Sequence, residues 1–190
     1  LIGQVQSQYA KYLLAVLSPL TLSAYVIAQG LAQKMAGGVV QLATSIYPAS
    51  ARVGFDKSFR QLYIKLQLGL LALGLLGVGI YYLFGLSFLS WWLHSSDLVR
   101  LVDSVMRVLI WYFVLLLLTP LPSTILDGTG HPGTGSLFVL VTTLIEISLA
   151  IILFNSYGIF APVYASLISV GITTPVLLYV TDKIMLKSKV

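Results

Sequence analysis

Cysteine is absent from this chain of 190 residues, and charged residues make up only 9% of it. Without cysteine the chain can form neither a disulfide framework nor a thiolate metal site. A soluble domain typically carries about 25% charged residues, so the scarcity of charge argues against a soluble protein. The two histidines, His94 and His131, lie far apart in the sequence and give no metal-site spacing.

Hydrophobic residues, in contrast, account for 58% of the chain, and the mean hydropathy is +0.96. The apolar runs are continuous and lack the alternation of membrane β-strands, so they predict transmembrane helices. Glycine, proline and charged residues divide the runs into six segments. These segments are Gln4–Leu17, Thr21–Tyr47, Gln61–Phe84, Asp97–Leu126, Gly135–Phe154 and Ile159–Val180. The predicted fold is an all-α, polytopic transmembrane helix bundle of about six helices.

Lysine and arginine gather on one predicted side of this bundle. Counting the crossings places the segment Arg52–Lys65 and the C-terminal tail DKIMLKSKV on the same side. Loops rich in lysine and arginine face the cytoplasm, so we expect this side to be cytoplasmic. Trp91 and Trp92 are expected in a turn at the opposite interface. The basic residues form no long patch, so the net charge of +5 does not indicate a nucleic-acid partner.

The second segment carries Lys34 near its middle, at a depth where a cation costs on the order of 3 kcal/mol. The helical face around Lys34 holds small and polar residues, namely Gly30, Gly37, Gly38 and Gln41. Another face carries a row of alanines suited to close helix packing, at Ala28, Ala32 and Ala36. Lys34 therefore either lines a wet cavity or pairs with a carboxylate inside the bundle, and both interpretations remain open.

Glu146 lies in the middle of the fifth segment. It shares a helical face with Thr142, Thr143 and Ala150. An acid at that depth is neutral and hydrogen-bonded, pairs with a cation such as Lys34, or couples the movement of protons or ions. The sequence supports a structural role and a coupling role alike.

The fourth segment carries Arg107 four residues after Asp103, a spacing that allows an ion pair along one helix face. Pro120 and Pro122 should kink or break its far end. The following loop, DGTGHPGTG, lacks the Lys-Ser/Thr ending and the preceding strand of a P-loop, so it predicts a tight turn. The carboxylates are scattered and no histidine accompanies the serines, so we expect no enzyme.

Four stretches together resemble one family of membrane transporters. They are AYVIAQGLAQ (24–33), YPASARVGFDKSFRQLYIKLQLGLLALGL (47–75), TILDGTGHPGTGS (124–136) and NSYGIFAPVYASLIS (155–169). In order and spacing they are similar to the polysaccharide flippase family of the multidrug/oligosaccharidyl-lipid/polysaccharide exporter superfamily. Carriers of that family have two helical lobes, so the resemblance implies that residues 1–190 are a single lobe, the C-terminal one, of a larger carrier.

The resemblance implies a flippase that moves undecaprenyl-pyrophosphate-linked oligosaccharide across the bacterial inner membrane, for surface polysaccharide synthesis, by alternating access. Its partners would be this substrate, the N-terminal lobe and membrane lipids, with no cofactor. Lys34, Gln41, Arg107 and Lys11 would then bind the substrate's head group, and Glu146 would couple transport. Two alternatives remain, an ion-coupled multidrug exporter of the same superfamily and a membrane assembly subunit that transports nothing.

Overall fold

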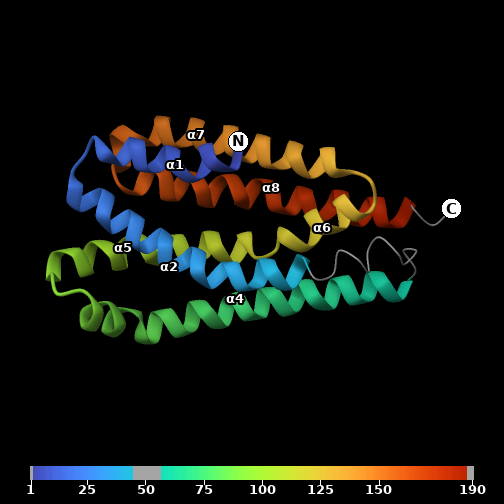
Figure 1. Ribbon diagram of the computed structural model, residues 1–190, viewed down its shortest axis with the longest axis horizontal. Coiled ribbons are helices and arrows are strands. Elements are labelled where there is room, and N and C mark those ends of the chain that lie inside the picture. The colour runs from blue at the N-terminus through green and yellow to red at the C-terminus, as the bar shows by residue number, and fades with distance from the viewer. Residues whose placement is uncertain (1, 45–56, 188–190) are drawn as a thin grey trace.

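The computed structural model of the chain describes residues 2–44 and 57–187, and it describes the side chains of all of these except 2–7, 35–36, 39–44, 57–58 and 187. The described residues form α1 (Ile2–Ala15), α2 (Pro19–Thr44), α4 (Lys57–Trp92), α5 (Ser96–Leu116), α6 (Pro120–Gly128), α7 (Pro132–Tyr157) and α8 (Phe160–Lys187). In Figure 1 the long helices run side by side, with α7 along one edge of the bundle and α4 along the other. No strand occurs in this part of the chain, and the all-α prediction is confirmed.

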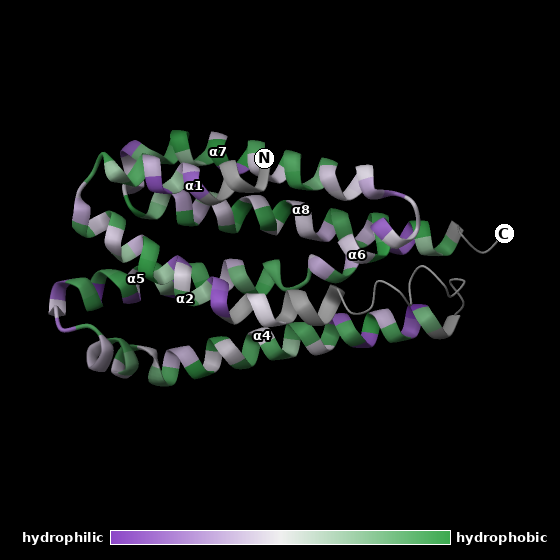
Figure 2. Ribbon diagram, viewed as in Figure 1, coloured by the Kyte–Doolittle hydropathy of each residue, from purple (hydrophilic) through white to green (hydrophobic). Residues whose placement is uncertain are grey.

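Four helical stretches within the described residues are long and apolar enough to cross a membrane. They are Phe59–Trp92, Ser96–Gly128, Pro132–Tyr157 and Phe160–Leu186. Figure 2 shows hydrophobic residues along most of the length of α4, α7 and α8. α1 has only 14 residues, and α2 has 26 residues but is not among the four apolar stretches. The chain is a multi-pass membrane protein by the length and composition of these helices.

The predicted break at Pro120 and Pro122 is confirmed, because α5 ends at Leu116 and α6 begins at Pro120. Neither proline has an N–H group to donate to the carbonyl four residues earlier. The two carbonyls concerned find other donors. Leu116 O accepts from the N–H and the hydroxyl of Thr119, at 3.1 and 2.9 Å. Leu118 O accepts from Gln67 Nε2 of α4 at 3.2 Å, so the break also joins α5 to α4.

α4 is longer than the predicted segment Gln61–Phe84. Its 36 residues extend about 54 Å at 1.5 Å per residue, well beyond a hydrocarbon core of roughly 30 Å. Trp91 and Trp92 lie in its last turn, so the prediction that they form a connecting turn is wrong. A helix satisfies its own backbone hydrogen bonds in lipid and in water. The helix can therefore continue through charged and aromatic residues after it leaves the apolar part of the bilayer.

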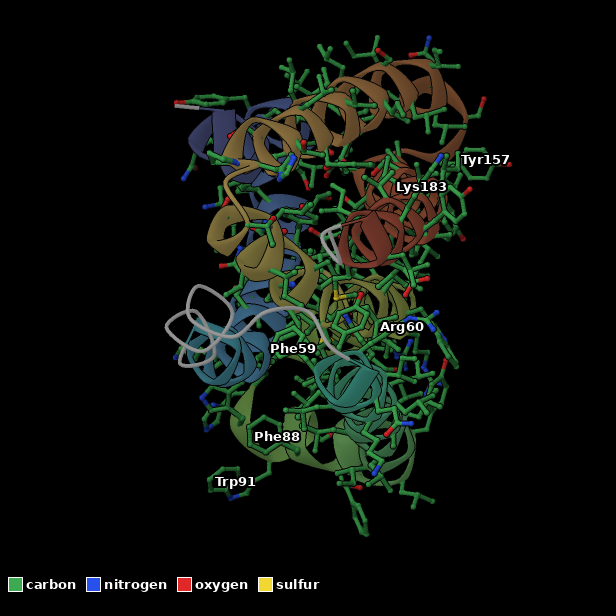
Figure 3. All side chains as sticks on the ribbon, turned by 90° about the vertical axis from the view of Figure 1, so that its right-hand side faces the viewer. Phe59, Arg60, Phe88, Trp91, Tyr157 and Lys183 are labelled. Carbon is green, nitrogen blue, oxygen red and sulfur yellow. The ribbon has the colours of Figure 1, made fainter. Side chains whose placement is uncertain are left out.

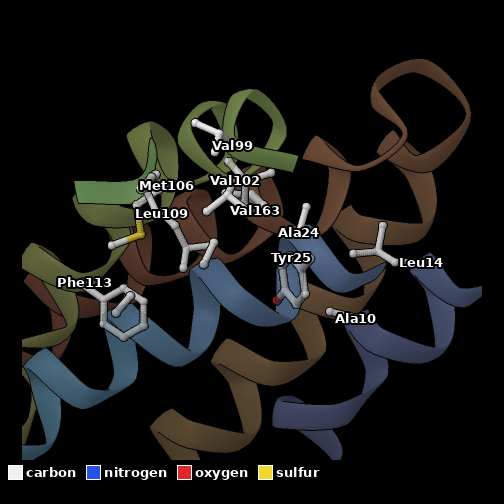
Figure 4. Packing of buried hydrophobic residues seen from close by; sticks show 14 of the residues in the cluster. Ala10, Leu14, Ala24, Tyr25, Val99, Val102, Met106, Leu109, Phe113 and Val163 are labelled. Atoms are coloured by element: carbon white, nitrogen blue, oxygen red, sulfur yellow. The ribbon is translucent and has the colours of Figure 1, made fainter. Parts of the chain in front are cut away.

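The largest hydrophobic core joins α1, α2, α4, α5 and α8, and Figure 4 shows part of it. Ala24, Ala28 and Ala32 of α2 are at most 2% exposed, and their small side chains let α2 pack closely on α5. The predicted packing role of Ala28 and Ala32 is confirmed. The side chain of Ala36 lies outside the described residues.

The start of α4 and the end of α8 meet at one end of the bundle, where Figure 3 shows Arg60 and Lys183. Arg60 Nε lies 2.7 Å from Asp182 Oδ1, and Arg60 Nη2 lies 3.0 Å from Asp182 Oδ2. Phe59, Tyr63 and Met185 join a small hydrophobic cluster beside this ion pair. The described part of the predicted basic side is therefore at one end of the molecule.

Breaking the Arg60–Asp182 ion pair should have a small effect, because its side chains are 42% and 32% exposed. Exposed pairs contribute about 0–1 kcal/mol. We expect Arg60→Asp to lower the melting temperature of the purified protein and the double change Arg60→Asp/Asp182→Arg to restore it. Lys65→Asp, on the exposed face of the same helix, is the control. Failure of the double change to recover stability would contradict a direct contact.

Candidate functional site

The buried face of α7 is polar, although the rest of the helix is strongly apolar. Its buried residues are Thr142, Thr143, Glu146 and Ala150, and apolar side chains such as Leu144 and Ile151 are exposed. This arrangement confirms the predicted face of Glu146. A membrane helix that turns hydroxyl and carboxyl groups towards its neighbours and apolar groups outwards is built for interhelical hydrogen bonding.

Glu146 is 3% exposed and is hydrogen-bonded by side chains from two other helices. Tyr9 of α1 donates its hydroxyl to Glu146 Oε1 at 2.9 Å, and Ser166 of α8 donates to the same oxygen. Tyr25 of α2 and Tyr112 of α5 lie within electrostatic range of the carboxyl group. Five helices therefore converge on one acid, and Glu146 is hydrogen-bonded to two of them.

The groups around Glu146 suit a carboxyl group that gains and loses a proton. A hydroxyl can donate a hydrogen bond or accept one. Tyr9 and Ser166 can therefore satisfy the ionised carboxylate as donors, and either can accept from the neutral acid. Ser166 Oγ also lies 2.8 Å from Pro162 O, which gives its proton a second acceptor. Both protonation states can thus be hydrogen-bonded without moving a helix.

A second polar contact joins α7 and α8 one turn away from Glu146. Thr142 Oγ1 lies 2.9 Å from Thr173 Oγ1 and 2.7 Å from Phe138 O. Thr173 in turn donates to Ser169 O at 2.8 Å. Hydroxyl groups therefore recur along the interface between α7 and α8, from Thr142 and Thr173 to Ser166, which contacts the carboxyl group of Glu146.

Lys34 has an exposed side chain halfway along α2. Ion pairs within the described residues join Arg60 to Asp182 and Arg107 to Asp103, and neither of them includes Lys34. Neutralisation of Glu146 by Lys34 would require an ion pair between the two residues, and none occurs among the described residues. Gly37 and Gly38 are exposed with it, so a small-residue face remains open around the ammonium group.

Arg107 forms the predicted ion pair with Asp103, since Arg107 Nε lies 2.8 Å from Asp103 Oδ2. Asp103 also accepts from the Tyr81 hydroxyl at 2.9 Å. The Arg107 guanidinium lies 5.3 Å from the centre of the Tyr82 ring, within cation–π range. The Arg107 side chain is 44% exposed, so this anchored residue still presents part of its surface outwards.

The remaining predicted head-group residues are Lys11 and Gln41. Lys11 lies on α1 with a half-buried side chain, two residues after Tyr9. The side chain of Gln41 lies outside the described residues. The structure thus shows no cluster that joins the described members of the predicted set, Lys34, Arg107 and Lys11.

An apolar cavity of about 430 Å³ lies between α2, α4 and α5. Its lining includes Ala32 of α2, Gly74 and Ile80 of α4, and Met106 and Phe113 of α5. Ala32 precedes Lys34 by two residues, and Met106 is followed by Arg107. Neither cation lines the cavity, because residues one or two apart on a helix point in different directions.

Sequence reasoning missed Tyr9 and Ser166 as partners of Glu146. The signal for Ser166 was present, because Ser166, Ser169 and Thr173 recur at helical spacing along an apolar helix. Tyr9 gave no such signal, since it lies 137 residues from Glu146. The described residues hold no group of three or more His, Cys, Asp or Glu side chains that could hold a metal ion.

No protein-family model and no curated protein matches the chain. Its structure is similar to an outward-facing multidrug resistance MATE family transporter of the MOP superfamily, with a TM-score of 0.81 at 18% identity, over 94% of this chain and 41% of that one. It is also similar to a MOP superfamily transporter from Pyrococcus furiosus Vc1, with a TM-score of 0.77 at 18% identity, over 94% of this chain and 40% of that one. The chain thus spans less than half of each transporter, and it has the fold of a MATE-like half-transporter.

Proposed function

We propose that this chain is one lobe of an alternating-access transporter that flips undecaprenyl-pyrophosphate-linked oligosaccharide across the bacterial inner membrane. The observation that carries the proposal is Lys34, an exposed residue halfway along α2 whose ammonium forms no ion pair with any residue that the structure describes. A cation at that depth requires water or an anionic ligand. The likeness of fold to two transporters supports alternating access between lobes.

The substrate's chemistry matches two features of the lobe. A diphosphate head group needs a cation, and lysine is a common phosphate binder that acts as a point charge. The isoprenoid tail needs an apolar route, and the proposed route is the apolar cavity between α2, α4 and α5. Arg107, Lys11 and Gln41 complete the proposed head-group set, with Arg107 held in place by Asp103.

Glu146 is the proposed coupling residue. It is buried among hydroxyl groups that can hydrogen-bond both of its protonation states. Alternating access in such a carrier needs a second lobe, and we propose that the N-terminal lobe of the same carrier is that partner. The end that carries Arg60 and Asp182 is proposed to be cytoplasmic, because lysine and arginine gather there.

The second candidate is an ion-coupled multidrug exporter. One structural neighbour is a multidrug resistance transporter, and a cavity with a mostly apolar lining also suits apolar drugs. The two functions differ in the charge of the substrate, since a flippase of pyrophosphate lipids moves an anion and many exported drugs are cations.

A transport assay separates these two functions. The complete carrier that contains this lobe, reconstituted in liposomes, should flip a fluorescent undecaprenyl-pyrophosphate-linked saccharide and should not move ethidium, a cationic drug. Undecaprenyl-linked saccharide without the diphosphate is the control for head-group recognition. Ethidium efflux with no flipping of the pyrophosphate lipid would overturn the flippase proposal in favour of the exporter.

A further inference from the structure

A second cavity, of about 100 Å³, lies between the α5–α6 break, α7 and α8. Unlike the apolar cavity, it has hydroxyl groups in its lining from all of these elements. They belong to Thr119, Ser123, Thr142, Thr173 and Thr174. A cavity of this size and polarity has room for several water molecules with polar partners for each.

Thr174, which lines this cavity, has a buried hydroxyl group without a hydrogen-bond partner among the described residues. The residue is 2% exposed, and the unpartnered atom is its Oγ1. A buried hydroxyl without a partner costs about 1–3 kcal/mol, so a lining residue of this cavity has an unmet hydrogen-bonding capacity. Pro175 follows directly and has no N–H to donate to the carbonyl of Gly171.

Glu146 does not itself line the cavity, and the lining residue of α7 nearest to it in the sequence is Thr142. Thr142 lines it and lies one helical turn before Glu146, a rise of about 6 Å along α7. Thr119, Ser123 and Gly135 line its other part, next to α6 and the start of α7. Figure 1 shows that this part lies towards the end of the bundle where α8 finishes.

We propose that this cavity is a water-filled vestibule through which protons reach Glu146 from the end of the molecule that carries Arg60 and Asp182. The inference rests on the proposed coupling role of Glu146. An excess proton carried by the cavity water binds the Glu146 carboxylate, which becomes the neutral acid and leaves neutral water behind. Tyr9, Tyr25, Tyr112 and Ser166 face the carboxyl group from the other four helices.

Single cysteines test this vestibule cleanly, because the chain contains no cysteine of its own. Thr174→Cys reports the cavity. Ser166→Cys reports whether water continues beyond the cavity lining to Glu146, because Ser166 hydrogen-bonds Glu146 and the change alters the volume very little. Thr181→Cys on α8 and Thr143→Cys on α7 are the controls, because both residues are buried, neither lines the cavity, and each hydroxyl donates to a carbonyl of its own helix. The probe is methanethiosulfonate ethylammonium, added to proteoliposomes with a thiol scavenger on the opposite side.

We expect Thr174→Cys and Ser166→Cys to react at least about tenfold faster than the two controls, because dry apolar surroundings suppress the reactive thiolate. The faster reaction should occur from the side that labels Gln61→Cys, an exposed position near Arg60. Equal rates at Thr174→Cys and Thr181→Cys would show a dry cavity and overturn the proposal. Labelling of Thr174→Cys alone, or of Ser166→Cys only from the opposite side, would overturn the route. These rates do not depend on transport, so they are separable from a failure of the proposed function.

Discussion

Replacing Glu146 with glutamine is expected to abolish transport driven by a proton or ion gradient and to leave the protein folded. Glutamine has nearly the same shape, and its carbonyl oxygen can accept the hydrogen bonds that Tyr9 and Ser166 donate to Glu146 Oε1. It cannot gain or lose a proton. The change therefore removes the proposed coupling chemistry while keeping most of the local packing.

Two further variants separate coupling from stability. Glu146→Leu removes the acceptor of the Tyr9 hydroxyl, and a buried donor without a partner costs about 1–3 kcal/mol. Its effect on Ser166 should be smaller, because that hydroxyl also reaches Pro162 O. Tyr9→Phe deletes one donor and should cost about 1 kcal/mol while retaining gradient-driven transport.

The measurements are substrate movement in proteoliposomes with an imposed gradient and the melting temperature of each purified variant. We expect Glu146→Gln to melt close to the unchanged protein and Glu146→Leu to melt lower. Gradient-driven transport that survives in Glu146→Gln, with an unchanged pH dependence, would remove this residue from the mechanism and leave it a structural role.

Local regularities made much of this structure predictable. The six predicted segments correspond to α1, α2, α4, the α5–α6 pair, α7 and α8. Arg107 and Asp103 pair because helical spacing alone brings residues four apart together. Thr142, Thr143 and Ala150 share the buried face of Glu146 for the same reason.

The contacts between distant residues were not predictable. Arg60 meets Asp182 across 122 residues, and Tyr9 meets Glu146 across 137. Which helices become neighbours depends on the packing of whole helix faces, and the periodicity of one helix does not contain that information. Likewise, the extension of α4 to Trp92 was not predictable from the apolar run, because a helix satisfies its own backbone hydrogen bonds beyond the bilayer as well as inside it.

Replacing Lys34 with alanine is expected to weaken binding of the substrate's diphosphate about ten- to hundredfold. A hydrogen bond to a charged group contributes about 1.5–3 kcal/mol, and each 1.4 kcal/mol is about a tenfold change in affinity. Lys34→Arg should retain most of the binding, because it keeps the charge while changing the geometry of the donors. Lys65→Ala is the matched control, since it removes an exposed lysine from another helix of the same lobe.

The binding measurement compares undecaprenyl pyrophosphate with undecaprenol, which has the same tail and no diphosphate. Lys34→Ala should lower the affinity for the first and leave the affinity for the second unchanged, with the variant present in the membrane at normal levels. A structural pair with Glu146 predicts a different result, in which Lys34→Ala destabilises the fold and a second change, Glu146→Ala, restores it. Because Lys34 is exposed and Glu146 is buried, we expect the two changes to affect stability independently. A folded Lys34→Ala protein with full affinity for undecaprenyl pyrophosphate would contradict both roles.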